Sequence, residues 1–215
     1  MLALRLDYLV GALTDLAASS ERRVDRMLNP DVQEFHLPPF FTPESGLRSG
    51  YMLAQYTAAT MVNECRSVGR PASDNTPVSG TQEDHVSMSS TSAFAARRTV
   101  ANVQSALAVE LVCAAQAAGF VGEGGPESTM ERRKGDGNSD GGDDVGDSAD
   151  EPGGADLTHG VGTGATYEAV RAVVPPLVDG RPVHEDVAAA DALVASGTLD
   201  AALAEALAEA GEEIE

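Results

Sequence analysis

Residues 106–118 read ALAVELVCAAQAA, and only two of these side chains are polar. Alanine and leucine are strong helix formers, and a helix that is apolar on all sides is buried on all sides. We expect this helix to begin near His85 or Ser90 and to run to Ala118, which makes it ~40–50 Å long at 1.5 Å per residue. In a chain of 215 residues, burial on every side favours the core of an oligomer.

A leucine pattern near the N-terminus predicts another helix. Its leucines are spaced four and three residues apart and so lie on one helical face. Burying a leucine is worth ~1.5–3 kcal/mol, so this face is expected to have a partner. The leucines are Leu2, Leu6, Leu9, Leu13 and Leu16. No capping residue precedes the pattern, which suggests a helix cut in the middle. A separate short helix is predicted at residues 21–28, capped by Ser19-Ser20.

The composition favours helices throughout the chain. Hydrophobic residues make up 42% and aromatic residues only 4%, with no Trp. A β-sandwich would need more aromatic and β-branched side chains, so we expect an all-α fold built as a long-helix bundle. Shorter helices are predicted at residues 44–68, 166–174, 185–196 and 199–210, with Gly197 in the C′ position that ends a helix.

Three regions differ in composition along the chain. Residues 1–120 form the predicted bundle core, and residues 158–215 form a smaller helical region. Between them, residues 121–157 are rich in Gly, Asp, Glu and Ser. This composition predicts a disordered acidic linker.

The charge of the chain limits its partners. The formal net charge is -20, and such a chain repels phosphate, so nucleic acid is excluded as a partner. Lys134 is the only lysine. An acidic surface that is poor in lysine suits a protein working in high salt, where counter-ions screen the self-repulsion. We therefore expect a halophilic source.

The cysteines and the apolar segments indicate the compartment. Cys65 and Cys113 each lie among apolar residues of a helical pattern and are expected to be buried, reduced thiols. Arg5, Asp7 and Asp15 interrupt any signal-peptide core. No charge-free apolar stretch is long enough to span a bilayer. We expect a cytoplasmic protein without a membrane segment.

A polar stretch at residues 82–88, QEDHVSM, precedes the long helix. Glu83, Asp84 and His85 could supply an acid–base pair. A metal site is disfavoured, because the other histidines stand at no recognised ligand spacing from His85. Alternatively, Asp84 or Ser87 caps the long helix, which is a common role for these residue types.

Further motifs accompany residues 82–88 along the chain. They are Ser20-Glu21-Arg22-Arg23, Leu37-Pro38-Pro39-Phe40, Ser49-Gly50-Tyr51-Met52, Ala54-Gln55, Leu107-Ala108-Val109-Glu110-Leu111 and Ala114-Ala115-Gln116. Together, and in this order, these motifs resemble the C-terminal part of histidine ammonia-lyases, which belong to the aromatic amino acid lyase family. The resemblance is close from residue 1 to about residue 120 and faint over residues 166–206.

The resemblance implies the C-terminal half of the lyase fold and the removal of ammonia from L-histidine to give urocanate. The family's electrophile is 4-methylidene-imidazol-5-one (MIO), which forms from an internal Ala-Ser-Gly without a metal. The residue that matches Glu83 lies at the substrate imidazole, and Gln82 would line the same pocket. A carboxylate suits an imidazole N–H, because a charge-assisted hydrogen bond is about twice as strong as a neutral one. The family forms homotetramers whose active sites draw on more than one subunit.

This chain lacks several catalytic residues of the family pattern. The family's Ala-Ser-Gly, catalytic tyrosine and carboxylate-binding arginine belong to the N-terminal half, and this chain begins after them. We therefore expect the isolated chain to be inactive, whether it is a truncated gene product, a mis-called start or one part of a split enzyme. Ala195-Ser196-Gly197 is expected to be a helix end rather than a cofactor source. Glu110 is expected to pair with an arginine of a neighbouring helix.

Two other functions stay open. The chain could be a non-catalytic helical oligomerisation module that kept its bundle after losing the chemistry. It could also belong to a lyase or aminomutase for another aromatic amino acid, although such relatives usually carry other residues at the position of Glu83. An in-frame Ala-Ser-Gly in the DNA upstream of Met1 would favour the enzyme over the module.

Overall fold

The computed structural model describes residues 1–33, 37–42, 47–73, 78–82, 85–121, 159–177 and 181–211. Every regular element within these residues is a helix, which confirms the all-α prediction. The α-helices are α1 (Leu2–Leu28), α2 (Met52–Ser67), α3 (Ser89–Val121), α5 (Val161–Arg171), α6 (His184–Ser196) and α7 (Thr198–Glu209). Three short 3-10 helices are η1 (Pro39–Phe41), η2 (Pro71–Ser73) and η3 (Ser79–Thr81).

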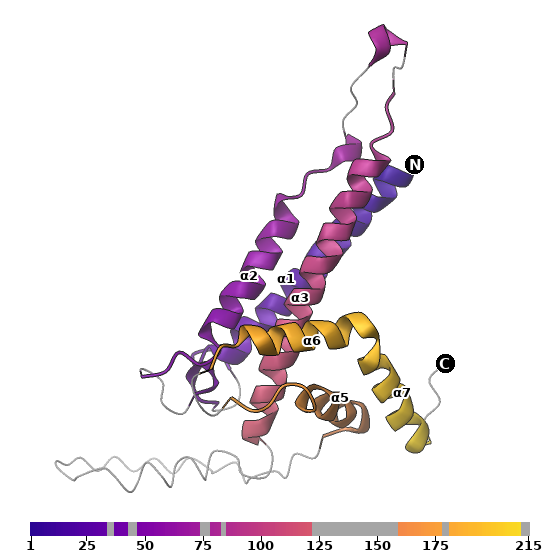
Figure 1. Ribbon diagram of the computed structural model, residues 1–215. Coiled ribbons are helices and arrows are strands. Elements are labelled where there is room, and N and C mark those ends of the chain that lie inside the picture. Colours follow the sequence, from indigo (N-terminus) through magenta and orange to yellow (C-terminus); the bar gives the residue numbers. More distant parts are fainter. Residues whose placement is uncertain are drawn as a thin grey trace, which may run out of the picture.

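Helices α1, α2 and α3 run side by side as an elongated bundle, and α5, α6 and α7 gather at one end of α3 (Figure 1). The predicted long helix is confirmed as α3. Helices α1, α2, α5 and α6 all contact it. Several side chains of its apolar stretch have no exposed surface: Ala106, Ala108, Val109, Val112 and Cys113. The chain's own helices therefore bury much of this stretch, although Ala114 remains exposed, and the oligomer expected from the sequence stays a prediction.

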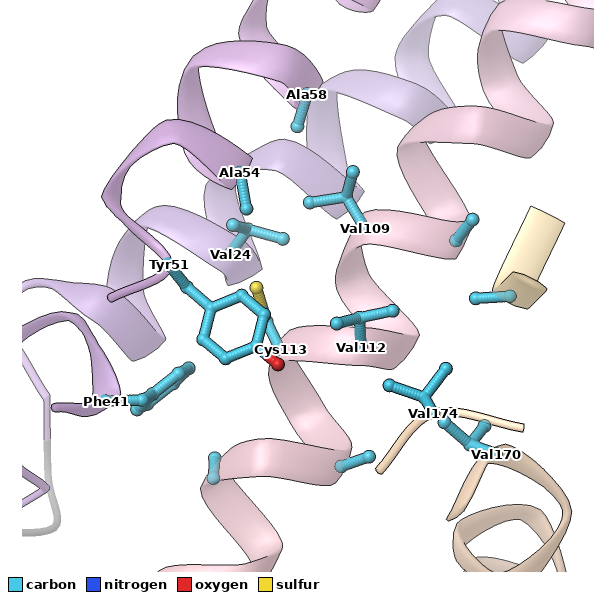
Figure 2. Close-up of a cluster of buried hydrophobic side chains, with 14 of the residues drawn as sticks. Val24, Phe41, Tyr51, Ala54, Ala58, Val109, Val112, Cys113, Val170 and Val174 are labelled. Atoms are coloured by element: carbon cyan, nitrogen blue, oxygen red, sulfur yellow. The ribbon is translucent and has the colours of Figure 1, made fainter. Parts of the chain in front are cut away.

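The main core joins the bundle to the C-terminal helices. Figure 2 shows Val24 of α1 and Ala54 of α2 beside Val109 and Val112 of α3, with Val170 of α5 on the other side of α3. Most of these side chains are alanine or valine, so the helices can approach one another closely. The core thus depends on small side chains, as the low aromatic content predicts.

Helix α1 is continuous from Leu2 to Leu28, and the predicted break at Ser19-Ser20 is wrong. Ser20 is fully buried, and its hydroxyl donates a hydrogen bond to Oε2 of Glu110 at 2.6 Å. The side chain that was expected to cap a new helix therefore bonds to α3 instead. Since no cap competes with the helical backbone there, α1 passes through this position.

The predicted leucine face of α1 is only half covered. Leu6 and Leu13 are half-buried, whereas Leu2, Leu9 and Leu16 keep 61%, 42% and 44% of their surface exposed. The buried face lies one residue further along the helix, at Ala3, Val10, Ala17 and Val24. Among the described residues, other helices therefore cover only part of the predicted leucine face.

Other predicted boundaries move by a few residues. Helix α2 begins at Met52 rather than at residue 44, and α5 begins at Val161 rather than at residue 166. Gly197 has φ +73°, which confirms its C′ position between α6 and α7. The predicted acidic linker at residues 121–157 lies outside the described residues apart from Val121. The proposed division into regions therefore stays a prediction.

Helix α3 is long and apolar enough, by length and composition, to cross a membrane. The sequence analysis excluded only apolar stretches without charged residues. Because α3 contains Glu110, it was not among them. Half of the apolar window is buried inside the structure, against the other helices of the bundle. The core helix of a globular bundle has the same length and composition, so the packing accounts for these features of α3.

Candidate functional site

The described residues of the predicted site stretch, 82 and 85–88, lie at the end of the bundle near the N-terminus, between η3 and α3 (Figure 1). Gln82 is exposed, and its backbone N–H donates to the carbonyl oxygen of Ser79 at 3.3 Å, which closes η3. His85 is also exposed. Glu83 and Asp84 lie outside the described residues. The structure thus places one of the two predicted site residues, Gln82, at an open end of the bundle.

The start of α3 carries the predicted capping serine. The Ser87 hydroxyl accepts a hydrogen bond from the backbone N–H of Ser89 at 3.4 Å and donates one to the Ser89 hydroxyl at 3.0 Å. Ser87 therefore bonds to the first residue of α3, in line with a capping role.

Asp7 of α1 accepts two hydrogen bonds at this end of the bundle. One carboxylate oxygen of Asp7, Oδ2, accepts from the backbone N–H of Ala72 in η2 at 2.9 Å. The other, Oδ1, accepts from the buried Ser92 hydroxyl of α3 at 2.7 Å. Asp7 therefore bonds to residues on both sides of the site stretch.

Glu110 lies in the middle of the bundle and makes the ion pair that the sequence predicts. Its carboxylate accepts from Nη2 of Arg23 at 2.8 Å and also from Nε of the same side chain. The hydrogen bond with Glu110 raises the pKa of Arg23. The ion pair between Arg23 and Glu110 holds α1 to α3, which is a structural role.

Glu21 forms a second polar contact between helices. It is 5% exposed, and its Oε1 accepts from the Gln55 side-chain amide of α2 at 2.9 Å. Arg22 beside it donates from Nε to Oε2 at 2.6 Å. The motif at residues 20–23 therefore connects α1 to both other helices of the bundle.

A cavity of about 740 Å³ lies at the opposite end of the bundle, where α2 and α6 begin. Its walls are mostly apolar, with Thr42, Arg48, Arg181 and His184 among the polar side chains. Apolar walls with a few polar groups are typical of ligand pockets. Sequence reasoning missed this place, because its residues come from separate segments without a recognisable spacing.

The backbone beside this cavity is strained. Phe40 and Phe41 have φ values of +54° and +58°, a region that non-glycine residues rarely adopt. Gly50 faces them with φ +47°, and a Cβ there would lie 2.2 Å from the carbonyl oxygen of Phe40. Only glycine fits at that position. Backbone strain of this kind is found mainly at functional sites. Pro38-Pro39 and the glycine are the only local signals that could have indicated it.

Two buried polar groups lie behind the cavity. The Tyr51 side chain is fully buried, and its hydroxyl has no hydrogen-bond partner among the described residues. Asp186 is 3% exposed; its Oδ1 accepts from Nη1 of Arg181, while Oδ2 has no partner among the described residues. Burial first, and then the negative charge of Asp186, raise the pKa of Tyr51 above its ordinary value. Tyr51 is therefore a neutral phenol and a poor base.

Ala195 and Ser196 are the last residues of α6, and Gly197 links this helix to α7. The Ser196 hydroxyl donates to the carbonyl oxygen of Leu193 at 3.1 Å, as a helix end allows. The tripeptide therefore has the conformation of a helix end, as the sequence predicts.

The histidines of the described residues are dispersed. His159 stacks on Tyr167 with ring centroids 5.1 Å apart, beside a second cavity of about 430 Å³ between α3, α5 and α7. His184 begins α6, and His36 lies outside the described residues. Within the described part of the chain, no group of three or more His, Cys, Asp or Glu side chains could hold a metal ion.

Comparison with known proteins gives one consistent match. Residues 1–135 match the family model described as aromatic amino acid lyase. A probable histidine ammonia-lyase from Halobacterium salinarum is 44% identical over 207 residues, which cover 96% of this chain and 33% of that protein. A histidine ammonia-lyase from Symbiobacterium thermophilum is 40% identical over 202 residues, covering 94% and 33%. The chain spans about a third of the length of these relatives.

Solved structures agree on the fold. Tyrosine aminomutase from Streptomyces globisporus has a TM-score of 0.75 at 30% identity, covering 99% of this chain and 34% of that one. Histidine ammonia-lyase from Trypanosoma cruzi has a TM-score of 0.73 at 28% identity, covering 95% and 34%. The long-helix bundle is therefore similar to a part of both structures.

Proposed function

Because this chain belongs to the aromatic amino acid lyase family, we propose that it is the C-terminal part of a histidine ammonia-lyase, which converts L-histidine to urocanate and ammonia. One observation carries the proposal: relatives named histidine ammonia-lyase, or probable histidine ammonia-lyase, are 40–44% identical over 94–96% of the chain. The Trypanosoma structure of the same name supports it.

The proposed substrate contact is the Glu83 carboxylate on the imidazole N–H, with the Gln82 amide in the same pocket. Gln82 is exposed, and its side chain makes no hydrogen bond within the described part of the chain, so it is available to a ligand. Glu83 follows it directly in the sequence. A carboxylate can hold the ring N–H through a charge-assisted hydrogen bond.

The MIO electrophile of the family does not fit the residues of this chain. MIO activates the substrate amino acid when it is present, and it forms from Ala-Ser-Gly. The one Ala-Ser-Gly in these residues is the helix end at 195–197, whose serine hydroxyl bonds to its own helix. No step of the reaction is therefore assigned to these three residues. The proposed enzyme takes its electrophile from another segment.

We further propose that the enzyme is a homo-oligomer whose sites use more than one copy of this chain. Residues 78–82, which include Gln82, and the strained Phe40–Phe41 segment lie at opposite ends of the bundle (Figure 1). The 16 residues of α2 alone span about 24 Å between them. A site that used both ends would therefore need a second copy. The exposed Leu2, Leu9 and Leu16 of α1 offer an apolar surface for association.

The function is tested by completing the enzyme. These 215 residues alone are expected to form no urocanate from histidine. The same residues fused behind the preceding two thirds of the Halobacterium relative are expected to form it, which ultraviolet absorbance detects directly. Turnover of tyrosine but not histidine by the fusion would instead favour an aminomutase or lyase for another aromatic substrate. An inactive fusion that folds and assembles normally would favour the non-catalytic oligomerisation module.

Self-association is tested on α1. Light scattering in molar salt is expected to show an oligomer for the chain, and Leu9→Glu with Leu16→Glu is expected to shift it toward the monomer. The reason is that charged side chains are costly in an apolar contact. Val32→Glu is the matched control, because Val32 is also exposed, at 48%, but lies outside α1. A compact monomer of the unmodified chain would contradict the proposal.

We also propose that the protein works in the cytoplasm of a halophile. The free thiols of Cys65 and Cys113 are both buried, as suits a reducing compartment. The net charge of -20 with a single lysine, together with the Halobacterium relative, supports a high-salt environment.

A further inference from the structure

The helices that follow α3 in the sequence meet the bundle at a noncovalent interface. Residues 159–177 and 181–211, called the C-terminal unit, carry α5, α6 and α7. The unit contacts the bundle mainly through α3, by way of α6 and α5. Residues 122–158 link α3 to the unit in the sequence. Because direct contacts also join the two sides, the attachment does not rest on the chain connection alone.

Gln116 of α3 pairs with the backbone of the C-terminal unit. Its side-chain Oε1 accepts a hydrogen bond from the Leu177 N–H at 3.1 Å, and its Nε2 donates one to the Leu177 carbonyl oxygen at 3.2 Å. Gln116 is only 5% exposed. The amide therefore satisfies both backbone groups of one residue in a buried place, which fixes where Leu177 lies and how it is turned.

Arg171, the last residue of α5, reaches in the opposite direction, from the unit onto α3. Its Nη2 donates to the carbonyl oxygen of Ala115 at 2.6 Å and to Oε1 of Gln116 at 3.4 Å. A Cβ at Gly119 would lie 3.3 Å from the same nitrogen, so the glycine leaves room for the guanidinium. Gln116 and Arg171 thus form a polar clamp to which both sides of the interface contribute.

Apolar side chains from both sides are buried around the clamp. Val170 and Val174 of the unit belong to the same buried cluster as Val112 of α3, and Figure 2 shows the three together. Ala190 and Leu193 of α6 are buried in this cluster as well. An apolar centre with polar groups that pair across the contact is typical of stable interfaces between separate proteins.

We propose that the C-terminal unit is docked on α3 by this interface and does not need the chain connection through residues 122–158 to stay there. The apolar cluster supplies most of the affinity, and the clamp supplies the orientation. The connection then serves only to keep the unit at a high effective concentration near α3. The proposal holds whatever reaction the chain takes part in, because it uses no residue of the proposed substrate contact.

Cutting the folded chain tests the docking. A recognition sequence for a site-specific protease is inserted within residues 122–158, and complete cleavage is checked on a denaturing gel. At micromolar concentration, the two pieces are expected to elute together in gel filtration, with the circular dichroism of the uncut chain. Separate elution of the pieces, or loss of helical signal after cleavage, would overturn the proposal.

Variants of Gln116 test the clamp. In the cut protein, Gln116→Ala is expected to weaken the association of the two pieces about 10- to 100-fold, because both buried backbone groups of Leu177 lose their partner. Gln104→Ala is the matched control, since Gln104 is a half-buried glutamine of the same helix, and it should leave the association unchanged. Unchanged association in Gln116→Ala would show that the clamp does not hold the unit.

Hydrogen exchange on the uncut chain gives a second measurement, which does not require the cut variant to fold. In Gln116→Ala, the amides of α5 and α6 are expected to exchange faster than in the unmodified chain, because the unit separates from α3 more often. Those of α1 and α2 should be unchanged, since these helices pack on α3 independently of the unit. Equally faster exchange in all four helices would mean that the unit and the bundle unfold together, and would overturn the proposal.

Discussion

In a lyase completed with its upstream part, Glu83→Ala is expected to lower kcat/KM for histidine about 30- to several thousand-fold. The carboxylate would meet the imidazole N–H in a partly dry pocket, and removing one partner of such a charged hydrogen bond costs ~2–5 kcal/mol. Each 1.4 kcal/mol is about tenfold in rate. Urocanate formation measured per folded molecule checks the result.

Neighbouring substitutions separate this role from helix capping. Glu83→Gln should be milder than Glu83→Ala, because it keeps the shape and one acceptor oxygen. Asp84→Ala and Ser87→Ala are the controls, and a capping role predicts that they lower stability by about 1 kcal/mol without a matching loss of turnover. Unchanged turnover in Glu83→Ala would remove the main residue-level support for a histidine substrate.

Composition was sufficient to predict the helical fold and the position of α3, because thirty-three consecutive helical residues leave a long apolar pattern. It did not identify which face of α1 is buried. Two apolar rows lie next to each other on that helix, one of leucines and one with Ala3, Val10 and Ala17. The smaller side chains are buried because they let the helix axes approach. The spacing of apolar residues reveals both rows, but it does not show how closely the helix axes approach.

The sequence also did not predict which side chains from distant parts of the chain contact each other. Ser20 looked like a local cap, yet its hydroxyl bonds to Glu110, which is 90 residues away in the sequence. The ion pair of Glu110 was predictable in kind, since a buried carboxylate needs a partner. Its identity as Arg23 required the packing of α1 on α3.

Some residues of the candidate site could be predicted from the sequence, and others could not. Gln82 and Glu83 were identified only through the resemblance of a whole series of motifs, because a short polar stretch alone also fits a helix cap. The strained Phe40–Phe41 segment and the Arg181–Asp186 pair lie on segments that are distant in the sequence. Their proximity comes from the way α6 packs at the start of α2, which no local spacing encodes.

The Arg181–Asp186 pair is expected to be the most costly single contact to break for stability. The Asp186 side chain is 4% exposed and that of Arg181 31% exposed. Nη2 of Arg181 also donates to the carbonyl oxygen of Pro175 at 2.7 Å. Arg181→Ala would leave Asp186 as a buried charge without a partner among the described residues. Removing one partner of a buried ion pair costs about 3–5 kcal/mol.

Urea unfolding of the chain measures this loss as a lower midpoint at an unchanged slope. Arg66→Ala on α2 is the control, because Arg66 is exposed and its removal should change the free energy of unfolding by less than about 0.5 kcal/mol. The double variant Arg181→Ala with Asp186→Ala should be more stable than Arg181→Ala alone, since it no longer buries a bare carboxylate. A double variant as unstable as the sum of the two single variants would show that the charge pairing does not hold α6 in place.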